Sequence, residues 1–329
     1  MAVKLKDTPS STLTKEPLLA LFLFLLLGCN TQKKEEKLPT EIPYVMVLGT
    51  AQDAGYPQGG ERDEFKLIEQ ERRERTYTVA LALVDPVTSK RYLFEATPDF
   101  REQLELADKR SKATNYPFDG IFLTHAHMGH YTGLMHLGFE AMSSSQTPVY
   151  AMPRMKEYLS NNGPWSQLVN FNNIELKSLQ DSTHVSLGQN IEIMPFTVPH
   201  RDEYSETVGF KIQIKEKSMV FIPDIDKWEK WDVDIREVVK DNDYILIDGS
   251  FYADGELPGR DMSVIPHPFT SESMELFKEL SSDDKAKVFF IHSNHTNPIL
   301  DPNSREFKEV QQKGFNIAQP EQVFTFDKK

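Results

Sequence analysis

The sequence is poor in cysteine and in basic residues. Of its 329 residues only Cys29 is a cysteine, so the chain can form no internal disulfide and any metal site lacks thiolate ligands. It carries 37 Lys and Arg against 50 Asp and Glu, a formal net charge of −13. Because an acidic chain repels polyanions, we expect no nucleic-acid partner. The hydrophobic content of 39% is enough for one large domain or two small ones.

Long apolar runs are also scarce, and the one near the N-terminus, from Leu18 to Leu27, follows several lysines. Roughly ten residues are too few to span a bilayer but suit the core of a signal peptide. The Leu-Leu-Gly-Cys that ends at Cys29 resembles the lipobox of bacterial lipoproteins. This resemblance implies a signal peptide at residues 1–28 and a lipid on Cys29 that attaches the protein to the membrane of the cell envelope. An uncleaved anchor or a buried free thiol is the alternative.

Residues 29–41 are polar and charged, which predicts a tether. From residue 42 to residue 329 short apolar stretches predict strands. These cover residues 44–49, 77–84, 91–96, 120–124, 191–198, 208–214, 218–223, 244–248 and 287–291. Helices are predicted over 99–110, with Asp99 as N-cap, and over 130–142, 271–280 and 304–313. Strands that lead each half, with helices between them, predict one α/β domain of two sheets between helices.

Polar side chains directly follow four of the predicted strands. His125 follows "IFLT", His200 follows "FTVP", Asp224 follows "VFIP" and His292 follows "VFFI". Strand ends hold side chains at fixed positions, as metal ligands require. A single histidine there is commonly just a loop residue, but four such positions in one chain favour a metal site.

The segment "IFLTHAHMGHYTGL" holds three of the nine histidines. His125 and His127 have strand-like spacing, which places both imidazoles on one face, where they can chelate a cation. His130 comes three residues later and can reach a second cation. The alternative is a histidine-rich turn without a metal.

Several motifs resemble those of the metallo-β-lactamase superfamily. "THAHMGHYTGL" resembles its His-x-His-x-Asp-His signature, and "VPHRDEYSETVGF", "VFIPD" and "FFIHSNHTNPIL" resemble its later motifs. "LGTAQDAGYPQ", "ATPDFREQL" and "IHSNHTNPIL" are similar to segments of the pyrroloquinoline quinone biosynthesis protein B family. The match runs from about Tyr44 to Phe326. It implies an αββα sandwich of two mixed β-sheets flanked by helices, with a metal cleft at one edge.

The resemblance also implies the ligands of the metal site. The first metal would be held by His125, His127 and His200, and the second by His130 and His292, with Asp224 between the two ions. His295 competes with His292 for the last position, and we prefer His292 because it lies nearer the strand end. Histidine and aspartate ligands suit one or two Zn ions and also permit Mn or Fe.

The chain departs from the signature at Gly129, where the superfamily has Asp. Glycine ligates no metal, so we expect a second site weaker than the first, which Gly129→Asp would strengthen. Asp53 is a candidate substitute ligand or catalytic base, with an ordinary turn residue as the alternative. Glu95 replaces an Asp that many members carry. The cysteine cluster that the quinone-biosynthesis relatives have near "GYPQ" is missing, so we expect no structural zinc there.

His267 lies before a predicted helix, between the last two motifs. Its placement resembles that of a catalytic histidine in tRNase Z and related phosphodiesterases, where it can donate a proton to a leaving group. The alternative is a plain loop residue. We therefore expect a metallo-hydrolase that uses metal-activated water on a small-molecule ester or phosphodiester outside the cytoplasm. Other possibilities are an Fe-dependent oxidative enzyme and a lapsed enzyme kept as a metal- or ligand-binding lipoprotein.

Overall fold

The computed structural model describes residues 38–111, 116–188 and 190–327, which belong to one unit of the chain. Cys29, the signal peptide and most of the tether lie outside the described residues, so lipid attachment stays a prediction. Within the described residues, no helix is both long enough and apolar enough to cross a bilayer.

The first sheet contains seven strands in the order β14-β1-β2-β3-β4-β5-β6. Its strands are β1 (Tyr44–Gly49), β2 (Ala80–Asp85), β3 (Lys90–Phe94), β4 (Gly120–Phe122), β5 (Thr147–Ala151), β6 (Ile174–Ser178) and β14 (Val323–Thr325). Strands β3 to β6 are parallel, whereas β2 is antiparallel to both β1 and β3. Strands β1, β3 and β4 therefore point the same way, and their carboxyl ends meet at one edge.

The second sheet has the order β13-β12-β11-β10-β9-β8-β7. Its strands are β7 (Val185–Gly188), β8 (Ile191–Thr197), β9 (Val208–Ile214), β10 (Lys217–Ile222), β11 (Tyr244–Asp248), β12 (Val288–Ile291) and β13 (Asn316–Ile317). Strands β10 to β13 are parallel, and β9 is antiparallel to both β8 and β10. The carboxyl ends of β8, β10, β11 and β12 therefore also share one edge.

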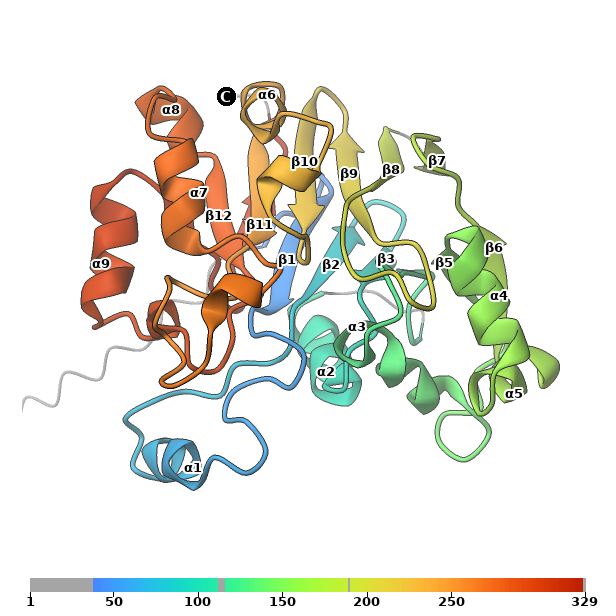
Figure 1. The fold of residues 1–329 in the computed structure, drawn as a ribbon. Coiled ribbons are helices and arrows are strands. Elements are labelled where there is room, and N and C mark those ends of the chain that lie inside the picture. The colour runs from blue at the N-terminus through green and yellow to red at the C-terminus, as the bar shows by residue number, and fades with distance from the viewer. Residues whose placement is uncertain (1–37, 112–115, 189, 328–329) are drawn as a thin grey trace, which may run out of the picture. The chain divides into compact units, whose positions relative to one another are not determined.

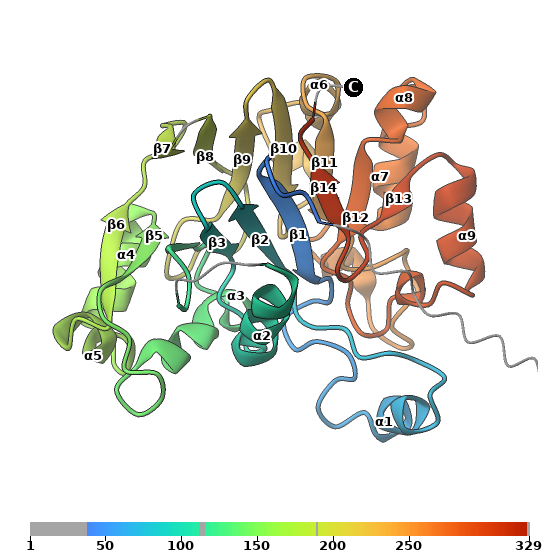
Figure 2. The same ribbon diagram turned by 180° about the vertical axis from the view of Figure 1, so that it is seen from behind.

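Helices cover the outer face of each sheet, as Figure 1 and the reverse view in Figure 2 show. On the first sheet lie α2 (Phe100–Arg110), α3 (Met128–Tyr131), the 3-10 helix η1 (Thr132–Leu137), α4 (Pro153–Asn161) and α5 (Trp165–Asn170). On the second lie α6 (Ile235–Lys240), α7 (Thr270–Leu276), α8 (Ser282–Lys285) and α9 (Arg305–Gln312). The remaining helical segments are α1 (Arg62–Glu69), η2 (Trp228–Lys230), η3 (Met262–Val264) and η4 (Pro298–Leu300).

Three apolar layers follow from this stacking. Alternation along β1 sends Met46 to the layer beneath α2, whereas Val45 and Val47 face the second sheet. Between the sheets, Val47 shares its cluster with Phe122 and Phe210. The outer face of the second sheet packs on helices α6, α7 and α9. The predicted αββα sandwich of two mixed sheets is therefore confirmed.

One local prediction was wrong. The helix expected over residues 130–142 is only α3 followed by η1, because the backbone N–H of Gly133 donates to Ala96 in place of a helical carbonyl. Asp99 is the N-cap residue of α2, as predicted, but its side chain makes no capping hydrogen bond. Its Oδ2 accepts instead from the backbone N–H and the hydroxyl of Thr78, tying the helix start to the approach to β2.

Candidate metal centre

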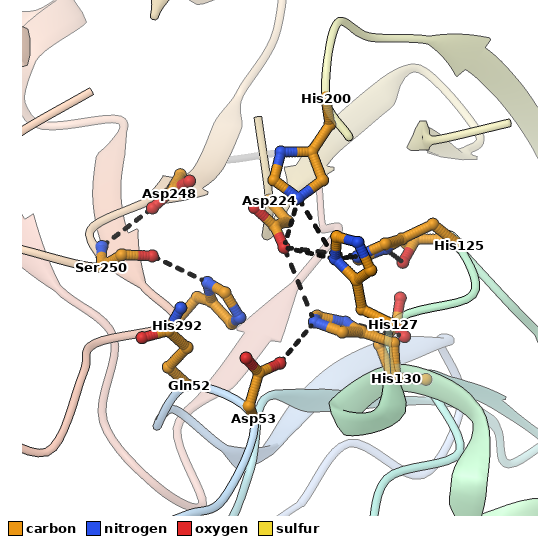
Figure 3. A network of polar contacts seen from close by, with 12 residues as sticks. Gln52, Asp53, His125, His127, His130, His200, Asp224, Asp248, Ser250 and His292 are labelled. Atoms are coloured by element: carbon orange, nitrogen blue, oxygen red, sulfur yellow. Dashed lines mark hydrogen bonds and ion pairs between the residues drawn. The ribbon is translucent and has the colours of Figure 1, made fainter. Parts of the chain in front are cut away.

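The polar residues that follow the strands of both sheets converge at one place (Figure 3). From the first sheet come the residues after β1, β3 and β4, which are Asp53, Glu95, His125, His127 and, at α3, His130. From the second sheet come the residues after β8, β10 and β12 and the last residue of β11, which are His200, Asp224, His292 and Asp248. Because the ligands follow strand ends that share an edge of each sheet, the fold brings the predicted residues together.

The first ligand group consists of His125, His127, His200 and Asp224, whose ligand atoms all lie within 4.8 Å of one another. Nε2 of His125 lies 2.8 Å from Nδ1 of His127, which in turn lies 3.3 Å from Nε2 of His200. Tetrahedral zinc with bonds of about 2.0–2.1 Å separates its ligand atoms by roughly 3.4 Å. The group therefore has nearly the dimensions that a zinc ion requires.

The second ligand group consists of Asp53, His130 and His292 and obeys the same 4.8 Å limit. Oδ1 of Asp53 lies 3.3 Å from Nε2 of His130. The imidazoles of His130 and His292 are fully buried, whereas the Asp53 side chain is half exposed. This group thus has one carboxylate that faces solvent and two rings that do not.

Asp224 lies between the two groups. Its Oδ2 is 3.3 Å from Nε2 of His125 and 3.2 Å from Nε2 of His200 in the first group. The same oxygen is 3.8 Å from Nε2 of His130 in the second. The structure therefore places the Asp224 side chain between the two groups, and its role as a bridging ligand stays a prediction.

Hydrogen bonds on the outer side of the rings fix which nitrogen faces inward. Glu95, also fully buried, accepts from Nδ1 of His130 at 3.1 Å, and Asp226 lies 3.2 Å from Nδ1 of His200. The hydroxyl of Ser250 lies 3.0 Å from Nδ1 of His292. Such partners hold a metal-binding histidine in one tautomer and orientation. The longer Glu95 therefore serves where many superfamily members have Asp.

Three residues of the site have positive φ, which is uncommon outside glycine. These are Asp53 at 24°, Glu95 at 76° and His292 at 66°. Strained backbone of this kind persists where the surrounding structure fixes it, commonly at functional sites. All three follow the carboxyl end of a strand, so the chain turns sharply there to direct the side chain into the site.

The pKa values of His125, His292 and Asp224 favour the forms that bind cations. Burial, with the nearby His130, lowers the pKa of His125 well below its ordinary value, and burial lowers that of His292 to about 4. Both rings are therefore neutral at pH 7. Burial alone would raise the pKa of Asp224, but the rings of His200 and His267 outweigh it and hold the pKa well below the usual carboxyl range. Neutral imidazoles and an ionised carboxylate are the states required of metal ligands. Burial alone would lower the pKa of His130 and of His200, but Glu95 and Asp53 beside the first ring and Asp224 beside the second outweigh it and raise both pKa values.

Buried polar atoms without hydrogen bonds test whether a metal fits. Nε2 of His292 is buried and makes no hydrogen bond, and Nε2 of His130 and Oδ1 of Asp224 are buried with only the charged contacts to Asp53 and to His267. Leaving such atoms unsatisfied is costly in a folded protein. Divalent ions in the two groups would satisfy the two ring nitrogens, so the residues present fit metal ions.

His267 contacts the bridging aspartate from the side of the second sheet. Its Nδ1 lies 2.8 Å from Oδ2 of Asp248 and 3.2 Å from Oδ1 of Asp224. Burial alone would lower its pKa, but these two carboxylates outweigh burial and raise the pKa of His267 to about 9. The structure thus places His267 beside the metal groups, as its sequence position suggested.

Asp248 and Ser250 were missed in the sequence. Asp248 is fully buried, binds His267, and accepts from the backbone N–H of Ser250 at 2.8 Å. With Asp224 and His292 it forms a third possible ligand group. A polar residue at the end of an apolar strand, the pattern that identified the histidines, also points to Asp248, which ends the strand "YILID".

The metal role predicted for His295 is not supported by its position. Its Nδ1 lies 2.7 Å from Oε1 of Glu64 in α1, and it belongs to none of the three ligand groups. The loop after β12 carries it past the site, whereas His292, directly at the strand end, remains inside. His184 pairs with Glu192 on the surface, in agreement with a structural role.

Comparisons with known proteins agree with the motifs. The model of the family described as "Beta-lactamase superfamily domain" matches residues 90–293. Coenzyme PQQ synthesis protein B of Acinetobacter baumannii (strain ACICU) is 24% identical over 313 residues, covering 84% of this chain and 97% of that protein. The protein of the same name in Methylococcus capsulatus is 25% identical over 307 residues, covering 83% and 97%. The sequence resemblance is thereby confirmed.

Solved structures share the fold. Zn(2+)-bound PqqB from Methylobacterium extorquens has a TM-score of 0.71 and 19% identity, with 86% of this chain and all of that chain covered. A diphosphatase from the PhnP family has a TM-score of 0.59 and 19% identity, covering 86% and 97%. At these identities the likeness shows the fold alone.

Proposed function

The chain belongs to the beta-lactamase superfamily, and on that premise we propose that it is a metal-dependent hydrolase. The observation that carries this proposal is the pair of ligand groups that meet at Asp224. Bound ions would supply a nucleophilic hydroxide at neutral pH and stabilise negative charge on the reacting oxygen. The substrate is a small-molecule ester or phosphodiester, since the acidic chain disfavours polyanions.

The protein's own residues would orient the substrate and move a proton. Both carboxylates that contact His267 do so through Nδ1, which leaves Nε2 to meet a substrate atom. Asp248 fixes the ring, because it is itself held by the backbone N–H groups of Ile225 and Ser250. His267 can then donate a proton from Nε2 to a departing oxygen, which favours phosphodiesters with basic leaving groups.

We expect His267→Ala to slow hydrolysis of diphenyl phosphate by about 10²–10⁴-fold, the usual contribution of a general acid. The loss should be smaller with bis(p-nitrophenyl) phosphate, because its leaving group is less basic and needs less protonation. Rates are measured on zinc-reconstituted protein, with metal content determined in parallel. His184→Ala, a surface histidine, is the control. An equal loss on both substrates would contradict the role of His267 as a proton donor.

Iron-dependent oxidation with O₂ is a second candidate. The relatives named Coenzyme PQQ synthesis protein B motivate it, and thiolate-free ligands permit Fe as well as Zn. Metal content after anaerobic purification distinguishes the two, because iron alone would favour oxidation. Bound metal without turnover of esters, phosphodiesters or O₂ would instead indicate a lapsed enzyme kept for binding.

We further propose that the protein is attached to the cell envelope through a lipid on Cys29. Cys29→Ser should then abolish incorporation of labelled fatty acid and leave the protein soluble or unprocessed, because no other cysteine can accept the lipid. Metabolic labelling of cells that express each form provides the measurement. Equal label on the wild type and the variant would refute lipidation at this position.

A further inference from the structure

Gly129 requires a structural explanation, because the superfamily signature has a metal-binding Asp there. It lies in α3 and has no positive φ, so the backbone conformation does not demand glycine. The explanation is space. A Cβ atom at position 129 would lie 2.3 Å from Oδ1, 2.5 Å from Cα and 3.0 Å from Cβ of Asp53. Any side chain at position 129 would therefore collide with Asp53.

Asp53 uses this space to reach the second ligand group. Its Oδ1 lies 3.3 Å from Nε2 of His130, and the two side chains form one group with His292. Nε2 of His292 lacks a hydrogen bond, and Nε2 of His130 has only its charged contact to Asp53. The Asp53 carboxylate is thus the acidic member of a group whose other two members are imidazoles.

The loop that carries Asp53 is fixed on both sides. The backbone N–H of Gln52 donates to the carbonyl of Ser293, the residue after His292, at 2.8 Å. On the other side, the hydroxyl of Thr78, which also contacts Oδ2 of Asp99, lies 3.3 Å from the carbonyl of Asp53. Because the loop is tied to the chain that carries His292, the position of Asp53 relative to that ligand is built into the fold.

We infer that Asp53 is the carboxylate ligand of the second metal, in the place of the Asp that the signature puts at position 129. The inference rests on the proposed function only in that both groups hold ions. On this inference the carboxylate has moved from position 129 to position 53, and glycine at position 129 leaves the space that the Asp53 side chain needs. The second site keeps a carboxylate, so we no longer expect the weak second site that Gly129 alone predicted. The single substitution Gly129→Asp would collide with Asp53 and would not strengthen metal binding at the second site.

The test is calorimetric titration of metal-free protein with Zn²⁺, together with elemental analysis. Wild type should bind two Zn²⁺ per chain. Asp53→Asn should bind one, with the affinity of the first group changed less than about threefold, and the second affinity should fall by more than 100-fold, since even outer partners of metal ligands contribute about 10–100-fold. Asp63→Asn, an exposed aspartate paired with Lys66, is the matched control and should bind two.

The double variant D53G/G129D reverses the exchange. Glycine at position 53 removes Cβ and Oδ1, and Asp at position 129 returns a carboxylate. A Cβ at position 129 would still lie 2.5 Å from Cα of residue 53, so recovery also requires that the freer backbone of a glycine at position 53 shifts away. It should recover the second Zn²⁺ that the single variant D53G loses. Loss of affinity at both groups in D53N, with no recovery in D53G/G129D, would mean that the loop merely misfolds, and would overturn the inference.

The remaining outcomes separate this inference from the proposed function. If D53N binds as many Zn²⁺ as wild type, with equal affinities, Asp53 is no ligand, whereas the metal-dependent function stands. If wild-type protein binds no Zn²⁺, both fail. Because the measured quantities are stoichiometry and affinity, neither result depends on a known substrate.

Discussion

Replacing Asp224 with asparagine should abolish hydrolysis and weaken binding of both metal ions by more than 100-fold each. Oδ2 of Asp224 is within 3.3 Å of a ring nitrogen of His125 and of His200, and within 3.8 Å of one of His130. One charged oxygen therefore lies close to ring nitrogens of both ligand groups. Asparagine keeps the size of the side chain but removes the negative charge that offsets two divalent ions.

The effect of Asp224→Asn should exceed that of any single histidine, because Asp224 contributes a negative charge close to the ring nitrogens of both groups. Calorimetric titration with Zn²⁺ measures both affinities in one experiment. Asp241→Asn, an exposed residue after α6, is the control for the substitution itself. Circular dichroism confirms that the variant is folded. A variant that retained one tight Zn²⁺ site would show that Asp224 belongs to a single group.

His125→Ala and His127→Ala should each remove the first ion, again with a loss of more than 100-fold in affinity. Their ring nitrogens lie 2.8 Å apart and face the same point, so neither can chelate the ion as well without the other. The second ion should be less affected, since Asp53, His130 and His292 remain. Elemental analysis of the purified variants gives the result.

The control for these two variants is His184→Ala, because His184 lies on the surface and pairs with Glu192 at 3.2 Å. It should keep the metal content of the wild type. Full occupancy in His125→Ala or His127→Ala would rule out the first ligand group as described. Loss of metal in His184→Ala as well would show instead that the preparation, and not the ligand, determines the metal content.

The sequence predicted those parts of the fold in which local pattern and tertiary structure agree. The strands that lead into the ligands are short and apolar and are followed by a polar residue, and each was found. Strand β5 was missed because it carries Pro148, a residue that normally argues against a strand inside a sheet. The helix after His130 was overestimated because the apolar spacing hid the contact between Gly133 and Ala96, which only the folded chain reveals.

The candidate site was predictable only where its residues follow strands that the local sequence pattern identifies. Strand ends identified the histidines, and the resemblance grouped them. The relation between Asp53 and Gly129 could not be read from the sequence, because it depends on a contact between positions 76 residues apart. The sequence leaves Asp53 open as a ligand or as a turn residue, whereas the steric conflict with position 129 favours the ligand.

The ligand groups have a mechanical consequence, since each of them takes members from both sheets. His125 and His127 belong to the first sheet and His200 to the second, and Asp53 and His292 are divided in the same way. A bound ion would therefore link the two sheets through its ligands. For an ion present at 100 times its dissociation constant, linkage adds about 2.7 kcal/mol to the free energy of unfolding. Resistance to heat, proteases and chelators would then rise and fall with the concentration of available metal.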